Sequence, residues 1–175
     1  MEIIDKGIYF LKQTFLDELK EIGTYTDHKQ RPIVALVPSS ENESIYWAIP
    51  MGDFSHRTEE QRKRLQTFLD YPESDIRSCY YHKGSTNKVS IFFISDVIPI
   101  TNDCIEREYS SHGSIYVIKN KKLIAELQRK MSRILAYDKA HIVSKGTPAF
   151  RQNISAIYNM LKLQLNSTIE ENRVE

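Results

Sequence analysis

The chain has 175 residues, of which 41% are hydrophobic and 27% are charged, and this balance predicts a soluble globular protein that can bury one core. The formal net charge is only +1, so the charge of the whole chain does not by itself indicate a nucleic-acid partner. The two cysteines, Cys79 and Cys104, stand far apart and exclude a disulfide framework, which fits a reducing cytoplasm, and no apolar run is long enough to span a membrane.

The first hundred residues are predicted to be rich in strands. Residues 7–11 have β-favouring side chains, and a short helix is expected to begin at Thr14 and to end at Gly23. An apolar strand at 33–37 and a returning strand at 45–49, joined by a hairpin loop, are expected next. Further strands are predicted at residues 79–82, 89–94 and 97–100.

A polar loop over residues 50–57 separates the returning strand from a predicted helix. Thr58, followed three residues later by Gln61, matches a capping box that begins this helix, and Pro72 is expected to end it.

The second half of the chain is predicted to be mainly helical. Residues 121–137 have apolar side chains at helical spacing, and Thr147-Pro148 is expected to begin a further helix. From Asn166 onward the chain is polar. We therefore expect one domain over residues 1–165 with a polar tail over 166–175, in an α+β fold whose sheet is mostly antiparallel.

Common catalytic and metal-binding motifs are absent from the sequence. It contains no GxxxxGK[ST] or GxGxxG phosphate loop, no HExxH zinc motif and no GxSxG nucleophile turn. The five histidines are scattered, and no tight group of carboxylates indicates a magnesium site. We expect neither a metal ion nor another cofactor.

The polar residues that attract attention lie near the ends of two predicted strands. Ser55, His56 and Arg57 follow the returning strand, while Lys29 and Arg31 precede the strand with which it would pair. A hairpin brings these two groups to the same end of the sheet. RNA cleavage without a metal needs a base for the 2′-hydroxyl, cations to offset the charge on the phosphorane, and an acid for the leaving 5′-oxygen.

These residue types suit the three tasks. His56 can act as base or acid because imidazole titrates near neutral pH, and Arg31 and Arg57 can hold a phosphate through bidentate hydrogen bonds. Ser55 can orient the phosphate or the 2′-hydroxyl. The same residues also fit an ordinary surface loop in which Arg31 pairs with an acidic neighbour, and the residue types alone leave both interpretations open.

Several short motifs resemble those of a known family. These are Gly-Ile-Tyr-Phe-Leu at 7–11, Arg31-Pro32 before an apolar strand, and Ile-Tyr-Trp-Ala-Ile-Pro at 45–50 leading to Ser55. They are similar to the type III toxin–antitoxin ribonucleases of the ToxN/AbiQ group, above all its CptN branch. The resemblance implies a small, strongly bent MazF/Kid-like (SH3-like) barrel with inserted helices and a helical C-terminal half.

The function implied by the resemblance is that of a toxin in phage defence. Such an enzyme cleaves cellular RNA without a metal, leaving 2′,3′-cyclic phosphate and 5′-hydroxyl ends. Its partner is a repeated, pseudoknotted antitoxin RNA, which the toxin cuts from a precursor and then holds, inhibited, in a larger toxin–RNA assembly. The family pattern of a Ser or Thr followed by a basic residue maps onto Ser55 with His56 or Arg57, and a basic residue near the preceding strand maps onto Lys29 or Arg31.

A basic stretch gives the expected RNA a surface to bind. Residues 119–145 hold eight Lys and Arg residues against Glu126 and Asp138, a local charge of 8 − 2 = +6. The rival interpretation is a non-catalytic RNA- or protein-binding domain with the same barrel. The candidate RNA-binding residues are Lys83, Lys88, Lys119, Lys121, Lys122, Arg129, Lys130, Arg133 and Lys145.

Overall fold

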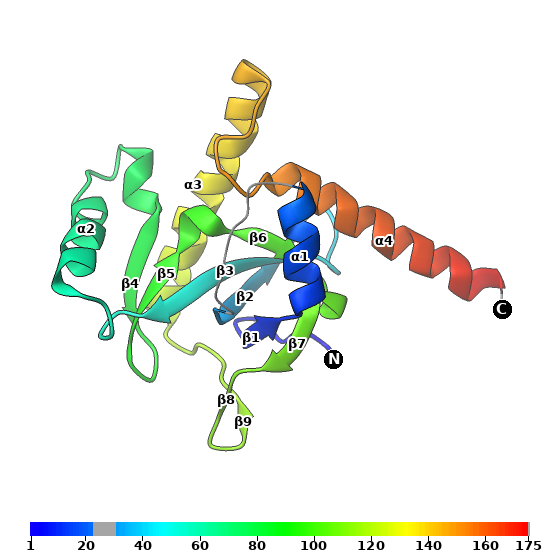
Figure 1. Ribbon diagram of the computed structural model, residues 1–175, viewed down its shortest axis with the longest axis horizontal. Coiled ribbons are helices and arrows are strands. Elements are labelled where there is room, and N and C mark those ends of the chain that lie inside the picture. The colour runs from blue at the N-terminus through cyan, green and yellow to red at the C-terminus, as the bar shows by residue number, and fades with distance from the viewer. Residues whose placement is uncertain (23–30, 175) are drawn as a thin grey trace.

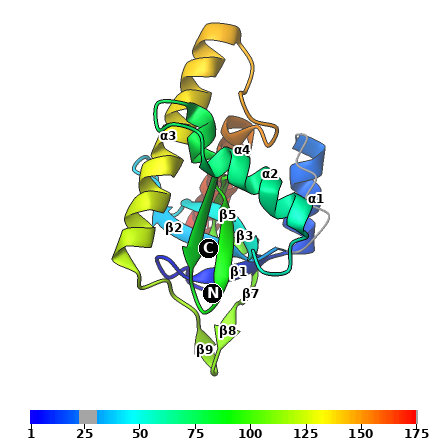
Figure 2. The ribbon, with the colours of Figure 1, turned by 90° about the vertical axis from the view of Figure 1, so that its left-hand side faces the viewer.

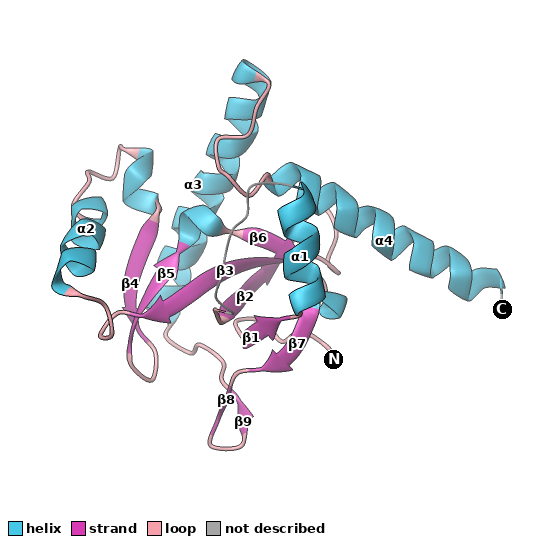
Figure 3. Cartoon of the chain, in the orientation of Figure 1, coloured by secondary structure: helices cyan, strands magenta, loops and turns pink. Residues whose placement is uncertain are grey.

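The computed structural model describes residues 1–22 and 31–174, with side chains up to residue 168, and confirms the α+β class with a mostly antiparallel sheet. Seven strands form the central sheet and four α-helices surround it in the described residues (Figure 3). Along the sheet the strands are β4 (Tyr81–Ser85), β5 (Val89–Phe93), β3 (Tyr46–Asp53), β2 (Ile33–Pro38), β1 (Ile8–Leu11) and β7 (Ile105–Glu108), and β6 (Ile98–Ile100) pairs with β3.

The sheet is an open path in the described part of the chain. It ends at β4 on one side and at β7 on the other, and no pairing joins these two edge strands to close a barrel. β3 is the longest strand, and on the side away from β2 it pairs first with β6 and then with β5. A small two-stranded hairpin of β8 (Ser110–Ser111) and β9 (Ser114–Ile115) projects from the body (Figure 1).

Helices cover both faces of the sheet, as Figure 2 shows for α3 and α1 on opposite sides. The alternation of side chains along β2 directs Ile33 and Ala35 to one core cluster and Val34 and Leu36 to another. The first cluster lies against α1 and α4, and the second against α3. Burial on both faces explains why this strand is an unbroken apolar run. The helices are α1 (Gln13–Ile22), α2 (Glu59–Leu69), α3 (Lys121–Lys145) and α4 (Ile154–Val174).

The predicted start of α2 is confirmed. The Thr58 hydroxyl accepts a hydrogen bond from the Gln61 backbone N–H at 3.2 Å, and the Gln61 side-chain oxygen accepts one from the Thr58 N–H at 3.1 Å. The loop before it is shorter than expected, because β3 continues through Asp53 instead of ending at residue 49.

The expected start of the last helix at Thr147-Pro148 is wrong. Residues 147–153 are an irregular return from α3, and α4 begins only at Ile154. Tertiary hydrogen bonds hold this segment: the Ala149 N–H donates to the buried Asp138 carboxylate at 2.8 Å, and the Gln152 amide donates to the Ser95 carbonyl.

Two other boundaries also differ from the prediction. Cys79 ends a short 3₁₀ turn (Ile76–Cys79) that the Asp75 carboxylate caps, so β4 begins at Tyr81 instead of at residue 79. α3 continues past residue 137 to Lys145, where Gly146 ends it in the left-handed conformation with a φ of 74°.

Candidate active site

The hairpin of β2 and β3 brings two arginines of the predicted site together over one aromatic ring. Arg31 directly precedes β2 and Arg57 follows β3, and their guanidinium carbons lie 4.7 Å and 5.0 Å from the centre of the Phe93 ring. Phe93 belongs to β5, which pairs with the end of β3. Arg31 and Arg57 are 26 positions apart in sequence, yet both contact the Phe93 ring. The sequence predicts that the two polar groups to which they belong lie at the same end of the sheet.

The surroundings of the Arg57 guanidinium disfavour its charged form. Burial lowers the pKa of Arg57 from its usual value, and the positive charge of Arg31 lowers it further. The Arg57 Nε is buried and has no hydrogen-bond partner among the described residues. A bound anion would offset the repulsion, because it places negative charge beside the two guanidinium groups.

Gly52 makes the room in which the Arg57 side chain lies. A Cβ atom at Gly52 would stand 3.2 Å from Arg57 Nη2 and 3.4 Å from the Phe93 ring. The guanidinium thus rests directly on the backbone of β3. The sequence does not single out this glycine, because its role depends on the packing of Arg57 against it, which local pattern does not show.

The Asp53 carboxylate organises the loop that carries the other predicted residues. It accepts a hydrogen bond from the Ser55 N–H at 2.8 Å, contacts Lys88 Nζ at 2.8 Å and lies 3.4 Å from His56 Nε2. The hydrogen bond from Lys88 is the main cause that lowers the pKa of Asp53. Ser55 is exposed and the His56 side chain is 85% exposed, so both can reach a molecule bound outside the loop.

Asp53 is a member of the candidate site that the sequence interpretation missed. The pattern Asp53-Phe54-Ser55 was available as an indication, since an aspartate that accepts from the N–H two residues later is a common turn motif. Lys29, by contrast, lies outside the described residues.

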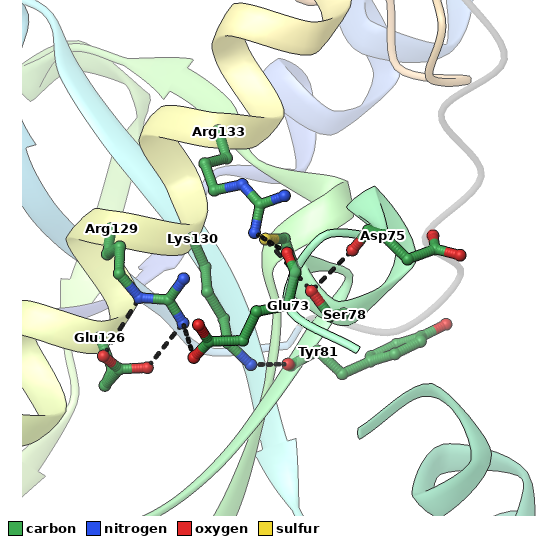
Figure 4. Close-up of polar contacts among 9 residues, drawn as sticks. Glu73, Asp75, Ser78, Tyr81, Glu126, Arg129, Lys130 and Arg133 are labelled. Atoms are coloured by element: carbon green, nitrogen blue, oxygen red, sulfur yellow. Dashed lines mark hydrogen bonds and ion pairs between the residues drawn. The ribbon is translucent and has the colours of Figure 1, made fainter. Parts of the chain in front are cut away.

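Three of the predicted RNA-binding residues have partners within the protein (Figure 4). Lys130 is only 8% exposed and donates to the Tyr81 carbonyl at 3.0 Å, so its assignment to a phosphate-binding surface is corrected. Arg133 donates to the Glu73 carbonyl at 2.6 Å, and Arg129 pairs with Glu126 at 2.9 Å. Lys130 and Arg133 thus fasten the segment that leads into β4 to α3, while the closest partner of Arg129 lies within α3 itself.

The remaining predicted cations lie at the surface. Lys83 stands 4.3 Å from the centre of the Phe54 ring, and Lys88 is held by Asp53. The last four are exposed: Lys119, Lys121, Lys122 and Lys145.

No protein-family model matches the chain, and no curated protein matches it. Among the described residues, no group of three or more His, Cys, Asp or Glu side chains could hold a metal ion. None of the helices in residues 1–22 and 31–174 is long and apolar enough to cross a bilayer. The arrangement itself offers two fixed guanidinium groups, with a hydroxyl and an imidazole in the adjoining loop.

Proposed function

We propose that this protein is a metal-independent endoribonuclease, the toxin of a type III toxin–antitoxin system that acts in the cytoplasm. The observation that carries the proposal is the pair of guanidinium groups of Arg31 and Arg57 over Phe93, with a buried Arg57 Nε left without a partner. The positive charge of Arg31 lowers the pKa of Arg57, and a bound anion beside the two groups would offset this repulsion. A phosphodiester is the anion whose oxygens suit two such groups.

In this mechanism the 2′-hydroxyl loses its proton as its oxygen attacks the adjacent phosphorus. Arg31 and Arg57 donate to the non-bridging oxygens, whose negative charge grows in the phosphorane. The bond from phosphorus to the 5′-oxygen then breaks, and this oxygen takes up a proton, which leaves a 2′,3′-cyclic phosphate and a 5′-hydroxyl. His56 exchanges the proton, Asp53 orients the His56 ring across 3.4 Å, and the Ser55 hydroxyl orients the phosphate.

A strongly bent sheet and the RNA partner belong to the same proposal, although the sheet does not close into a barrel in the described residues. The pairing of β3 with β6 and then with β5 fits a sheet bent around this strand, as in a MazF/Kid-like architecture. The exposed lysines 119, 121, 122 and 145 would contact phosphates of a repeated antitoxin RNA, so its binding should weaken with salt. The toxin would process this RNA and remain inhibited by it in a larger assembly.

The test is cleavage of a mixed RNA by purified protein in EDTA, with analysis of the new ends. Wild type should leave cyclic phosphate ends. Arg57→Lys keeps the charge but loses the planar fork, and we expect a loss of roughly 10²–10³-fold, with a loss of roughly 10²–10⁴-fold for His56→Ala. Arg62→Lys, on the exposed side of α2, is the matched control and should retain full activity.

Each contrary outcome removes a different part of the proposal. Cleavage that stops in EDTA would contradict metal independence. Cleavage that survives both variants would move the active site elsewhere. No cleavage of any RNA would contradict the enzyme and favour a non-catalytic RNA-binding domain.

A further inference from the structure

A cavity of about 210 Å³ opens on the face of the sheet opposite the two arginines. Met51 and Asp53 line it from the end of β3, Phe10 lines it from β1, and Tyr109 follows β7. The turn between β4 and β5, which points downward in Figure 1, closes another side of the cavity.

The walls of this cavity combine flat apolar side chains with polar groups at one rim. The Phe10 and Tyr109 rings are 6.1 Å apart and tilted by 38°, and Met51 completes the apolar wall. At the rim, Lys88 is held against Asp53, and the Asn87 side-chain oxygen accepts from the Thr86 hydroxyl at 3.2 Å. The Asn87 amide NH₂ has no hydrogen-bond partner among the described residues, which leaves two donors for a ligand.

The size and the chemistry of the cavity select a class of ligand. Its volume is below the roughly 300–1,000 Å³ typical of pockets for drug-sized molecules, and it suits one flat ring system. Aromatic walls with an amide at the edge are the usual means by which proteins stack an unpaired base and hydrogen-bond its edge. The Arg107 guanidinium, 3.8 Å from the centre of the Phe10 ring, and Lys88 supply positive charge beside this cavity.

Only the backbone of β3 separates the cavity from Arg57 of the arginine pair. Gly52 lines the cavity, while a Cβ on this residue would meet the Arg57 guanidinium at 3.2 Å. β3 ends at Asp53, so an RNA strand that crosses this end of the sheet passes from one face to the other.

We propose that this cavity binds a single nucleobase of the RNA, adjacent to the phosphate held by Arg31 and Arg57, and thereby sets the sequence preference. The inference rests on the proposed ribonuclease function. In it the Tyr109 and Phe10 rings stack on the base and the Asn87 amide contacts the edge of the base.

Direct binding tests the cavity without any need for cleavage. The wild-type protein is titrated with the four nucleoside 3′-monophosphates and with inorganic phosphate. At least one nucleotide should bind more tightly than phosphate, and Tyr109→Ala should weaken that nucleotide by about 5-fold to 150-fold, the loss expected when stacking on one ring is removed. Asn87→Ala should reduce the difference between the four nucleotides, whereas Asn166→Ala, exposed on α4, should change nothing.

The outcomes separate this inference from the proposed function. Binding of all four nucleotides no tighter than phosphate would overturn the base site, even if the protein cleaves RNA. Discrimination that persists in Asn87→Ala and Tyr109→Ala would overturn it as well, by locating the base elsewhere. If wild type discriminates between bases and both variants lose this, the base site stands even where no cleavage is found. In an active enzyme, Asn87→Ala should also redistribute the cut sites in a mixed RNA.

Discussion

Replacement of Gly52 by alanine tests whether the position of the Arg57 guanidinium matters for cleavage. The added methyl group would stand 3.2 Å from Arg57 Nη2, closer than ordinary van der Waals contact, so the guanidinium must move away from β3. The same methyl group would stand 3.4 Å from the Phe93 ring, the ring over which the Arg57 guanidinium lies. Displacement of a catalytic donor by about 1 Å can cost roughly 100-fold, and here the shift is a few tenths of an ångström or more, so we expect cleavage to fall about 10-fold to 100-fold.

The stability of the Gly52→Ala protein should change little. Alanine in a strand is favoured over glycine by roughly 0.5–1 kcal/mol, which offsets part of the steric cost. Gly84→Ala in β4 is the matched control with the opposite expectation. There the new Cβ would stand 2.6 Å from Leu123 Cδ1 in the core, and overpacking should lower the free energy of unfolding by about 1–3 kcal/mol. Cleavage per folded molecule should remain unchanged in this control.

The assay is therefore paired: single-turnover cleavage of one RNA substrate and thermal unfolding of both variants. The reasoning is refuted if Gly52→Ala cleaves at the wild-type rate while folded, because the contact with Arg57 would then have no role in catalysis. A fall in cleavage that only tracks a fall in the unfolding temperature would refute it as well.

Three further predictions concern residues outside the arginine pair. Burial, and secondly the charge of Lys130, lowers the pKa of His82 to about 4 from an unfolded value near 6.5. The folded state therefore binds fewer protons than the unfolded state between these values, so the unfolding temperature should be highest above pH 6.5 and should fall as the pH drops to about 4. The His82→Gln variant should lack this pH dependence. Lys130→Ala leaves the Tyr81 carbonyl without its donor and should lower the free energy of unfolding by about 1–3 kcal/mol in a denaturant titration, with no change in the salt dependence of RNA binding. Lys121→Ala should leave the free energy of unfolding unchanged, because Lys121 is exposed. It should reduce the slope of the logarithm of the RNA-binding constant against the logarithm of the salt concentration by about 1.

Much of the fold follows from local pattern. The apolar run at 33–37 requires a strand covered on both faces, and helices pack on both sides of β2. The capping box at Thr58 fixes the start of α2 from two side chains alone. What local pattern cannot supply is a tertiary contact, and the segment before α4 is held by two of them: Ala149 donates to the Asp138 carboxylate, and Gln152 donates to the Ser95 carbonyl.

The charge pattern is a poorer guide than the helical face on which each charge lies. Lys130 counts toward the basic stretch of residues 119–145, yet it follows Leu127 by three residues and precedes Ile134 by four. It therefore lies on the apolar face of α3, and the structure buries it there. The same periodicity leaves Lys121 and Lys122 at the surface. Helical position, applied to each cation in turn, would have separated the two groups from sequence alone.

The candidate site divides for an equally simple reason, the period of two along a strand. Gly52 and Asp53 are neighbours in β3, so the space over Gly52 and the side chain of Asp53 lie on opposite faces of the sheet. Arg57 rests over Gly52 on one face, and Asp53, Lys88 and the cavity lie on the other. The residues Ser55-His56-Arg57 are continuous in sequence, but they follow the end of β3 and connect two separate surfaces: the Arg57 face and the face with the cavity. A nucleotide has the same division into an anionic phosphate and a flat base, and under the proposed function an RNA strand would occupy both surfaces at once.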